Sequence, residues 1–305
     1  MSDLLSVEDL EVSIGAVRPV RGVSLRVAPG EIVGVVGETG CGKTLTGLAV
    51  LGLLPPGARA SGRVVLGGDD VLGGDPRAVR GRKVTMVFQN PGTAFDPVTT
   101  IGGQFARVLR AHTGCSRRAA RARAAELLTA VELPERVLDN YPHQLSGGML
   151  QRCMIALALS CEPSLVIADE ATTALDVTVA RQILRLLLRL QREHGFGVMF
   201  VTHNLAEARD ICDRVYVLYA GRVAEEGMAH AVLDRPRHPY TRALLAALPR
   251  LDAPRGRLAS IPGSVSHAEV GCSFAERCPD AKDVCRAETP PAHDGVACHF
   301  PGGAP

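Results

Sequence analysis

The residues most able to do chemistry stand where a strand-like run gives way to a helix-like run. Residues 37–44 read GETGCGKT, and they follow EIVGVV and precede LTGLAVLGLL. Glycines let backbone N–H groups turn inward around an anion, and the positive end of a following helix points at the same place. The run therefore predicts a loop that binds nucleotide phosphates. A flexible glycine turn is the alternative, and the strand-to-helix context disfavours it. We assign phosphate contacts to Gly37, Glu38, Thr39, Gly40, Cys41, Gly42, Lys43 and Thr44.

Two carboxylates end a later apolar run, LVIADE at residues 165–170. Placing acids at the end of a buried strand is costly unless a cation or a reaction uses them. Asp169 suits Mg²⁺ beside the hydroxyl of Thr44. Glu170, one residue further along, is suited to accept a proton from an attacking water. The alternative is that both acids cap the following loop.

Two further polar residues follow strand-like runs. Gln89 comes after VTMVF, where its side chain would reach Mg²⁺ or the attacking water, and His203 comes after GVMFVT, where it would contact a terminal phosphate. An open α/β sheet binds its ligand at the carboxyl ends of the strands. Taken alone, each residue would more often be a satisfied polar residue at a strand end. Together with the carboxylates they predict a catalytic set of Glu170, His203 and Gln89.

Composition and charge restrict the class of protein. The chain has 305 residues, of which 46% are apolar, and this fits a packed protein with one sizeable core and an appendage, or two domains. A net charge of +2 argues against nucleic acid as a partner. No apolar run approaches the roughly 18 residues that span a bilayer, and the acidic start does not resemble a secretory signal. We therefore expect a cytosolic protein that meets membranes only through partners.

The order of the elements predicts an α/β fold. Strand-like runs alternate with helix-like runs, which is typical of a mainly parallel sheet covered on both faces. Between residues 101 and 161 the strand character is lost, so a helical insertion interrupts the sheet. We expect strands at 5–14, 19–27, 31–36, 164–169, 197–202 and 213–219, and helices at 43–53, 101–112, 116–131, 147–161, 178–194 and 204–212.

The ordered series GETGCGKT, Gln89, LSGGM (145–149), LVIADE, ALD (174–176) and His203 resembles the ATP-binding cassette proteins. Within them the chain is most similar to the ATPase subunits of bacterial and archaeal dipeptide and oligopeptide importers, a group that includes nickel importers. The stretches that carry this similarity are SGGMLQRCMIALAL, DEATTALDVTVA, YAGRVAEEG, HPYTRALLAALP and a cysteine-rich tail. The similarity covers essentially the whole chain.

The resemblance implies a fold and a division into domains. It implies an α/β P-loop nucleotide-binding domain with a RecA-like core, antiparallel β and helical subdomains, and a small C-terminal Cys-rich extension. We place the ATPase domain at 1–230, its helical subdomain at about 96–161, and the extension at 231–305.

The resemblance also implies that one ATP is shared between two cassettes. Ser146, Gly147 and Gly148 form a second anion cradle, which in the family binds ATP held by the opposing subunit. Asp176 couples the two sites across the interface. Ile14 stands where the family commonly has an aromatic residue under the adenine, so base selectivity should be loose. Met149 replaces the usual glutamine after SGG, as in the peptide importers.

From the resemblance we expect an ATPase that powers import of dipeptides or oligopeptides. Its implied cofactors are ATP and Mg²⁺. Its implied partners are a second ATPase subunit, identical or homologous, two transmembrane permease subunits and an extracytoplasmic substrate-binding protein. It would lie at the cytoplasmic face of the inner membrane as a peripheral subunit. The alternatives are another solute such as nickel, a cassette acting on nucleic acid or ribosomes, and an ATP sensor without turnover.

Nine cysteines in a reducing compartment do not suggest a disulfide framework. The tail holds Cys272, Cys278, Cys285 and Cys298, whose spacing fits neither a common zinc site nor a ferredoxin. The resemblance favours a 4Fe–4S cluster on these thiols, with zinc or unliganded thiols as alternatives. Separately, Cys41 near Lys43 is interpreted as a neutral small residue; the alternative is a thiol of lowered pKa that makes nucleotide binding sensitive to oxidation.

Overall fold

The computed structural model describes residues 3–173, 175–248, 261–266 and 269–302; Ala174, the first residue of the ALD sequence, and Pro249, the last of HPYTRALLAALP, lie outside them. A large mixed sheet forms the centre, with strand order β11-β12-β10-β9-β3-β8-β7-β6. Its parallel strands are β3 (Ile32–Val36), β6 (Val84–Val87), β7 (Leu165–Asp169), β8 (Gly197–Thr202) and β9 (Arg214–Tyr219). The antiparallel part consists of β10 (Arg222–Met228), β11 (Ala292–His293) and β12 (Val296–Ala297).

The central strands are apolar along their whole length because both faces of the sheet are covered. Every residue of β3, β7 and β8 is buried, which is typical of parallel sheets. Parallel pairing brings the carboxyl ends of β6, β7 and β8 to one edge. The predicted strands at 31–36, 164–169, 197–202 and 213–219 are confirmed to within one residue.

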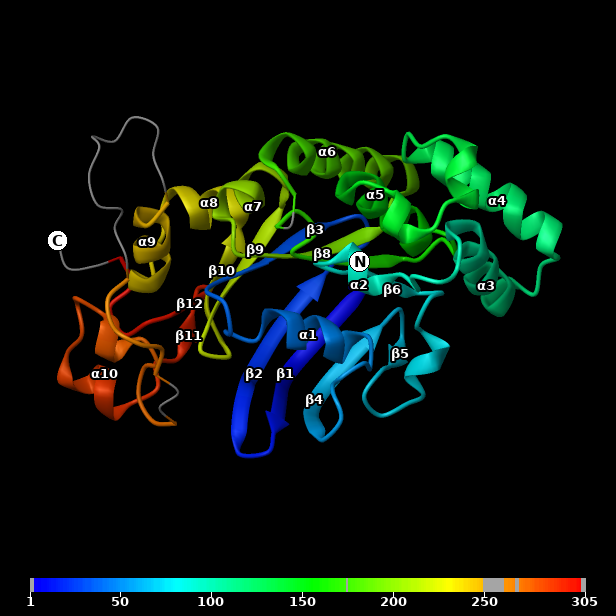
Figure 1. Cartoon of the computed structure of the whole chain (residues 1–305). Helices are drawn as coiled ribbons and strands as arrows, with labels where there is room; N and C mark the ends of the chain where they lie inside the picture. The colour runs from blue at the N-terminus through cyan, green and yellow to red at the C-terminus, as the bar shows by residue number, and fades with distance from the viewer. Residues whose placement is uncertain (1–2, 174, 249–260, 267–268, 303–305) are drawn as a thin grey trace.

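A second, antiparallel sheet packs against one face of the first. It has the order β2-β1-β4-β5 and comprises β1 (Leu5–Ile14), β2 (Val17–Val27), β4 (Ala58–Leu66) and β5 (Asp69–Asp70). The helix α1 (Lys43–Val50) lies between the two sheets (Figure 1) and contacts β2, β4, β7 and β8. Its buried residues Ala49 and Val50 join a core with Leu25 and Ile167. This packing fixes the start of α1 beside the end of β3.

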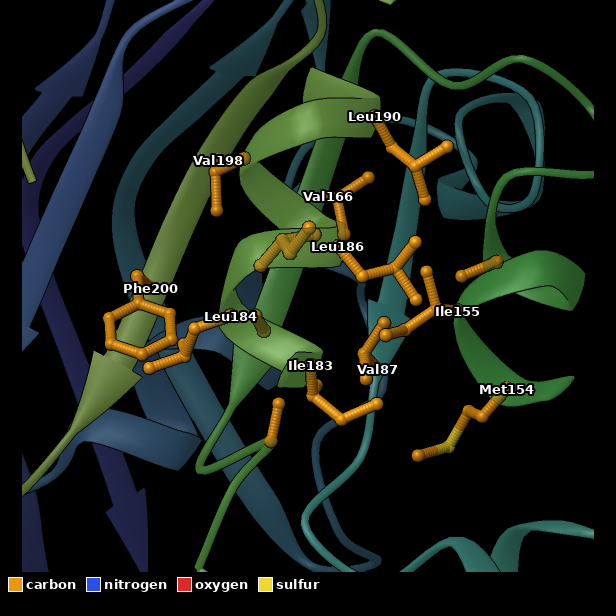
Figure 2. Packing of buried hydrophobic residues seen from close by; sticks show 14 of the residues in the cluster. Val87, Met154, Ile155, Val166, Ile183, Leu184, Leu186, Leu190, Val198 and Phe200 are labelled. Carbon is orange, nitrogen blue, oxygen red and sulfur yellow. The ribbon is translucent and has the colours of Figure 1, made fainter. Parts of the chain in front are cut away.

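Helices cover the other face of the large sheet. Figure 2 shows α5 and α6 packing on it, with Ile155, Ile183 and Leu186 meeting Val87 and Val166. The helices predicted at 101–112, 116–131 and 147–161 are confirmed in their order and approximate extent. The helices on this side are α2 (Pro91–Ala94), α3 (Ile101–Thr113), α4 (Arg117–Ala130), α5 (Gly147–Ala158), α6 (Val177–His194) and α7 (Leu205–Ile211).

The C-terminal segment packs beside β10 (Figure 1). It contains α8 (Ala229–Asp234), α9 (Pro239–Ala246), α10 (Asp283–Ala287) and the short strands β11 and β12. Tyr240 and Phe274 are buried and belong to the same core as the helices of the insertion. The predicted boundary near residue 230 stays a prediction. Among the helices that the structure describes, none combines the length and apolar character needed to cross a membrane.

Candidate functional site

The GETGCGKT loop joins β3 to α1, and its glycines are required by its backbone. Gly37, Gly40 and Gly42 have φ angles of 150°, 84° and 101°, a region that other residues rarely adopt. A Cβ at Gly37 would lie 2.2 Å from the carbonyl oxygen of Leu218, and one at Gly42 would lie 2.5 Å from that of Pro19. The loop therefore fits between neighbouring backbones only because these side chains are absent.

Lys43 begins α1 and is almost completely buried. Its Nζ donates hydrogen bonds to the carbonyl oxygens of Gly37, at 2.8 Å, and Glu38, at 3.0 Å. The charge of Lys43 is thus held against the loop that precedes it. An anion cradled by that loop would meet both the helix N-terminus and this ammonium group.

Thr44 and Asp169 form the second part of the site. The Thr44 hydroxyl, at the start of α1, donates to Oδ1 of Asp169, at the end of β7, over 3.1 Å. Burial raises the pKa of Asp169, and the hydrogen bond from Thr44 partly opposes this shift. A hydroxyl and a carboxylate are the hard oxygen ligands that Mg²⁺ prefers. These residues fit a magnesium ion.

Glu170 is held by three neighbours. Its Oε2 accepts hydrogen bonds from Nε2 of Gln89, at 3.0 Å, and from the hydroxyl of Thr173, at 3.2 Å. Its Oε1 lies 3.2 Å from Nδ1 of His203. The backbone of Glu170 has a φ of 45°, a strained value of the kind that clusters at functional sites. Its N–H donates to the carbonyl of Val201, which ties the strained residue to β8.

These residues share one cleft of about 400 Å³ at the carboxyl edge of the sheet. The structure thus brings the predicted Gln89, Glu170 and His203 to the phosphate loop. Asp169 lies at its base through the bond with Thr44. Sequence reasoning did not assign Thr173 or Leu45. The lining residues are Thr39, Gly40, Gly42, Lys43, Thr44, Leu45, Gln89, Glu170, Thr173 and His203.

Comparison with known proteins decides the family. A family model described as "ABC transporter" matches residues 20–173, and one described as "Oligopeptide/dipeptide transporter, C-terminal region" matches residues 224–285. The chain belongs to the ABC transporter family. The predicted resemblance to the ATPase subunits of its peptide importers is confirmed.

Relatives match this ABC protein over nearly their whole length. It is 43% identical to the dipeptide transport ATP-binding protein DppD of Escherichia coli, across 98% of this chain and 97% of that protein. It is 46% identical to the probable peptide ABC transporter ATP-binding protein y4tR of Sinorhizobium fredii, across 94% of this chain and 90% of that protein.

Solved structures confirm the mixed α/β ABC ATPase fold. The structure of cbiO1 from Clostridium perfringens, part of the transporter complex cbiONQ, is 26% identical, with a TM-score of 0.67, covering 77% of this chain and 92% of that one. The cassette MJ0796, a dimer in a post-hydrolysis state bound to ADP and phosphate, is 28% identical, with a TM-score of 0.64, covering 74% and 98%. The prediction of an ABC-type ATPase subunit is thereby confirmed.

Other predicted site residues of this ABC ATPase do not line the cleft. Ser146 and Gly147 are exposed at the start of α5, and Gly148 is half-buried. The hydroxyl of Ser146 accepts a hydrogen bond from the Met149 N–H at 3.4 Å, so it caps the helix. An exposed helix N-terminus remains open to an anion that another molecule presents.

Asp176 and Ile14 also lie outside the lining of the cleft. Asp176 is exposed at the start of α6, where its carboxylate accepts the N–H groups of Thr178 and Val179, both at 3.0 Å. Ile14 is half-buried at the end of β1 and pairs with Val17. Their assigned roles in coupling and under the adenine stay predictions.

The predicted 4Fe–4S cluster in the tail is wrong, and the zinc alternative has no support. Within the part of the chain that the structure describes, no group of three or more His, Cys, Asp or Glu residues is arranged to hold a metal ion. The four thiols of the tail surround a cavity of only about 20 Å³, which has room for about one water molecule. Burial raises the pKa of Cys278 to about 11 and raises that of Cys272 and Cys298, which favours the protonated thiols in the chain without a metal. The tail is therefore not organised as a cysteine–metal extension. The cysteines concerned are Cys272, Cys278, Cys285 and Cys298.

The alternative interpretation of Cys41, a thiol of lowered pKa, is also corrected. Burial raises the pKa of this thiol, and the nearby charge of Lys43 only partly opposes the shift. The side chain is 4% exposed. A buried protonated thiol reacts slowly with oxidants, so the idea of redox-sensitive nucleotide binding loses its basis.

Two residues of the C-terminal segment reach the phosphate loop and were missed by sequence reasoning. The hydroxyl of Tyr240 accepts the N–H of Glu38 at 2.9 Å. Arg277 forms a salt bridge with the Glu38 carboxylate at 2.7 Å. Arg277 and Glu38 are 239 positions apart, and no local pattern links residues at such a distance.

Proposed function

We propose that this ABC ATPase binds ATP at the cleft and that hydrolysis powers the import of dipeptides or oligopeptides through a membrane complex. The single observation that carries the ATPase part is the convergence of Lys43, Thr44, Glu170 and His203 on one cleft. The peptide class is supported by the match of residues 224–285 and by relatives named for dipeptide transport.

The residues of the cleft divide the chemistry between them. The phosphate loop and Lys43 bind and orient the triphosphate. Glu170 accepts a proton from the attacking water, while Gln89 and His203 hold its carboxylate in place. Thr44 and Asp169 would hold Mg²⁺, with the amide oxygen of Gln89 as a further ligand. Mg²⁺, when bound, would neutralise charge on the phosphate oxygens.

A second cassette completes the site in this proposal. Ser146, Gly147 and Gly148 would contact ATP that is held by the phosphate loop of the other cassette, a second copy or a homologous subunit. The exposure of Ser146 and Gly147 at the start of α5 supports this arrangement, because none of the three residues lines the cleft of its own chain. ATP would then join two cassettes, hydrolysis would release them, and Asp176 would couple the two sites.

The remaining partners follow from the peptide-importer assignment. We assign two permease subunits in the membrane and an extracytoplasmic substrate-binding protein, with this chain as a peripheral subunit on the cytoplasmic face. Gln89 and the helical insertion would pass the motion of the cassettes to the permeases. Gln89 suits this role because it links the end of β6 to Glu170.

Uptake by vesicles tests the proposed function. The chain, its permease subunits and the binding protein are reconstituted with ATP on the cassette side, and entry of a labelled dipeptide is measured. We expect uptake that requires ATP and is lost in Lys43→Ala. ATP hydrolysis without dipeptide uptake, together with uptake of Ni²⁺, would contradict the peptide assignment and leave the ATPase assignment standing.

A further inference from the structure

Arg277 lies in the C-terminal segment, yet its guanidinium group contacts the phosphate loop. Its side chain is only 4% exposed. An arginine has five N–H donors, and each of them finds an acceptor here. Nη1 and Nη2 donate to the two carboxylate oxygens of Glu38, at 2.7 and 3.0 Å. The other three N–H groups donate to the hydroxyl of Tyr219 and to the carbonyls of Pro262 and Ile261.

Glu38 connects Arg277 to the backbone of the phosphate loop. Its N–H donates to the hydroxyl of Tyr240, and its carbonyl oxygen accepts from Nζ of Lys43 at 3.0 Å. The side chain and both backbone groups of one loop residue are therefore engaged. Two of these partners, Arg277 and Tyr240, belong to the C-terminal segment. The third is the lysine that would bind the phosphates.

Aromatic rings hold the guanidinium group in position. Its central carbon lies 5.7 Å from the ring centre of Tyr219 and 6.0 Å from that of Phe274. The rings of Tyr219, Tyr240 and Phe274 contact one another, with centroids 4.5 to 5.4 Å apart. All three side chains are almost completely buried. This packing restricts the motion of Arg277 and holds its guanidinium group against Glu38.

The charge of Glu38 explains why such a partner matters. A carboxylate in a loop that binds a triphosphate repels the ligand unless a cation neutralises it. The bidentate hydrogen bonds neutralise Glu38, and because the Arg277 side chain is 4% exposed and that of Glu38 27% exposed, the pair is stronger than a fully exposed ion pair. The hydrogen bonds with Glu38 also raise the pKa of Arg277, which keeps the guanidinium charged.

We propose that Arg277 is a positioning residue for ATP binding, acting through Glu38 on the charge and shape of the phosphate loop. It does not contact the nucleotide. The C-terminal segment therefore controls the affinity of the ATP site. A change in that segment alters the surroundings of Lys43. This inference rests on the proposed binding of ATP at the loop.

The test measures the dissociation constant of Mg-ATP for the full chain and three variants. In Arg277→Gln the Glu38 charge is left without its partner, and we expect about tenfold weaker binding, which corresponds to about 1.4 kcal/mol. In Glu38→Gln/Arg277→Gln the repulsive charge is gone too, and we expect binding to return close to that of the parent. Arg242→Gln is the matched control, because Arg242 pairs with Asp280 at 2.6 Å in the same segment without touching the loop.

The outcomes separate a role in the loop from a role in folding. Weak binding in Arg277→Gln that Glu38→Gln restores, with normal binding in Arg242→Gln, supports the proposal. A double variant as weak as Arg277→Gln, or an Arg277→Gln chain that binds like the parent, overturns it. If Arg277→Gln does not fold, Arg277→Lys replaces it, with an expected loss of about threefold, or 0.65 kcal/mol; parent-like binding would then overturn the proposal. A parent chain that binds no Mg-ATP would instead overturn the proposed function itself.

Discussion

Two regions of the chain are suited to hold anions, and they differ in how complete they are. The loop from Gly37 to Gly42 has glycines with positive φ angles, a buried lysine and the carboxylates of neighbouring strands around it. The start of α5 at Ser146 has an exposed hydroxyl that caps the helix. Gly147 and Gly148 have ordinary helical geometry. The first region is assembled within one chain, whereas the second presents only a helix end to the surroundings.

This difference bears on the proposal that two cassettes share each ATP. A helix N-terminus binds an anion best when other groups hold the same anion. Around the phosphate loop those groups are present, and around Ser146 they are not among the contacts that the described part of the chain makes. The comparison therefore favours a site that two cassettes complete together.

The largest expected effect is at Glu170. Glu170→Gln removes the proton acceptor, so we expect turnover to fall by about 10² to 10⁴-fold. Binding of Mg-ATP should be kept, because the phosphate loop is unchanged. Phosphate release and equilibrium binding measure the two quantities. Glu207→Gln is the control, since Glu207 accepts from Thr172 outside the lining of the cleft. Normal turnover in Glu170→Gln would remove Glu170 from this role.

Lys43→Ala tests the phosphate loop by its effect on the affinity for Mg-ATP. Loss of a charged hydrogen-bond donor to phosphate costs about 1.5 to 3 kcal/mol, so we expect Mg-ATP to bind about 10 to 100-fold more weakly. Lys83→Ala removes a lysine that pairs with Asp69 at 2.7 Å, away from the cleft. It should bind as the parent does. Retained affinity in Lys43→Ala would mean that the loop does not hold the phosphates.

Ser146→Ala tests the start of α5 by its effect on the turnover of ATP. We expect turnover to fall about tenfold, as for one charged hydrogen bond, while the affinity of a dilute, separate chain for Mg-ATP is unchanged. Ser116→Ala is a matched control, because Ser116 caps α4 in the same way, accepting from Ala119 at 3.2 Å. Each variant loses about 1 kcal/mol of helix capping. Equal turnover in the two variants would show that Ser146 only caps a helix.

Asp169→Asn has the smallest expected effect, on stability without nucleotide. Burial raises the pKa of Asp169 above its usual 3.8, so the ionised carboxylate lowers the free energy of unfolding of the chain. This destabilisation is absent below pH 3.8, grows as the pH rises, and is complete above the raised pKa. The variant should therefore melt at a higher temperature than the parent at pH 7, and the difference should vanish as the pH falls. Asp139→Asn should show the opposite sign, because the hydrogen bonds from Arg121 lower the pKa of Asp139. An Asp169→Asn midpoint below that of the parent at pH 7 would contradict this reading.

The cleft was predictable because each of its parts is encoded locally. The glycines of the loop follow one strand directly, and Gln89, Glu170 and His203 each follow the strand that positions them. Parallel pairing then brings the strand ends together without further information. Thr173 was missed, although its place beside Glu170 in DEATTALD gave a usable signal.

The C-terminal segment was less predictable because its contacts are long-range. The link between Arg277 and Glu38 depends on how α9 and the loop around Phe274 pack on β9, and no spacing in the sequence encodes it. The cysteine prediction failed for a related reason. The resemblance predicted that the four thiols lie close together, and they do line one small cavity, but it did not give the size of that cavity. Burial raises the pKa of Cys41, opposite to the lowered pKa of the alternative interpretation.

Mixing two inactive variants tests the shared site most directly. Lys43→Ala disables the phosphate loop and keeps Ser146, whereas Ser146→Arg blocks the helix end and keeps the loop. A mixed pair contains one intact site only if the two halves come from different chains. We expect each variant alone to hydrolyse ATP poorly and the mixture to regain hydrolysis. A mixture as inactive as its components would contradict it.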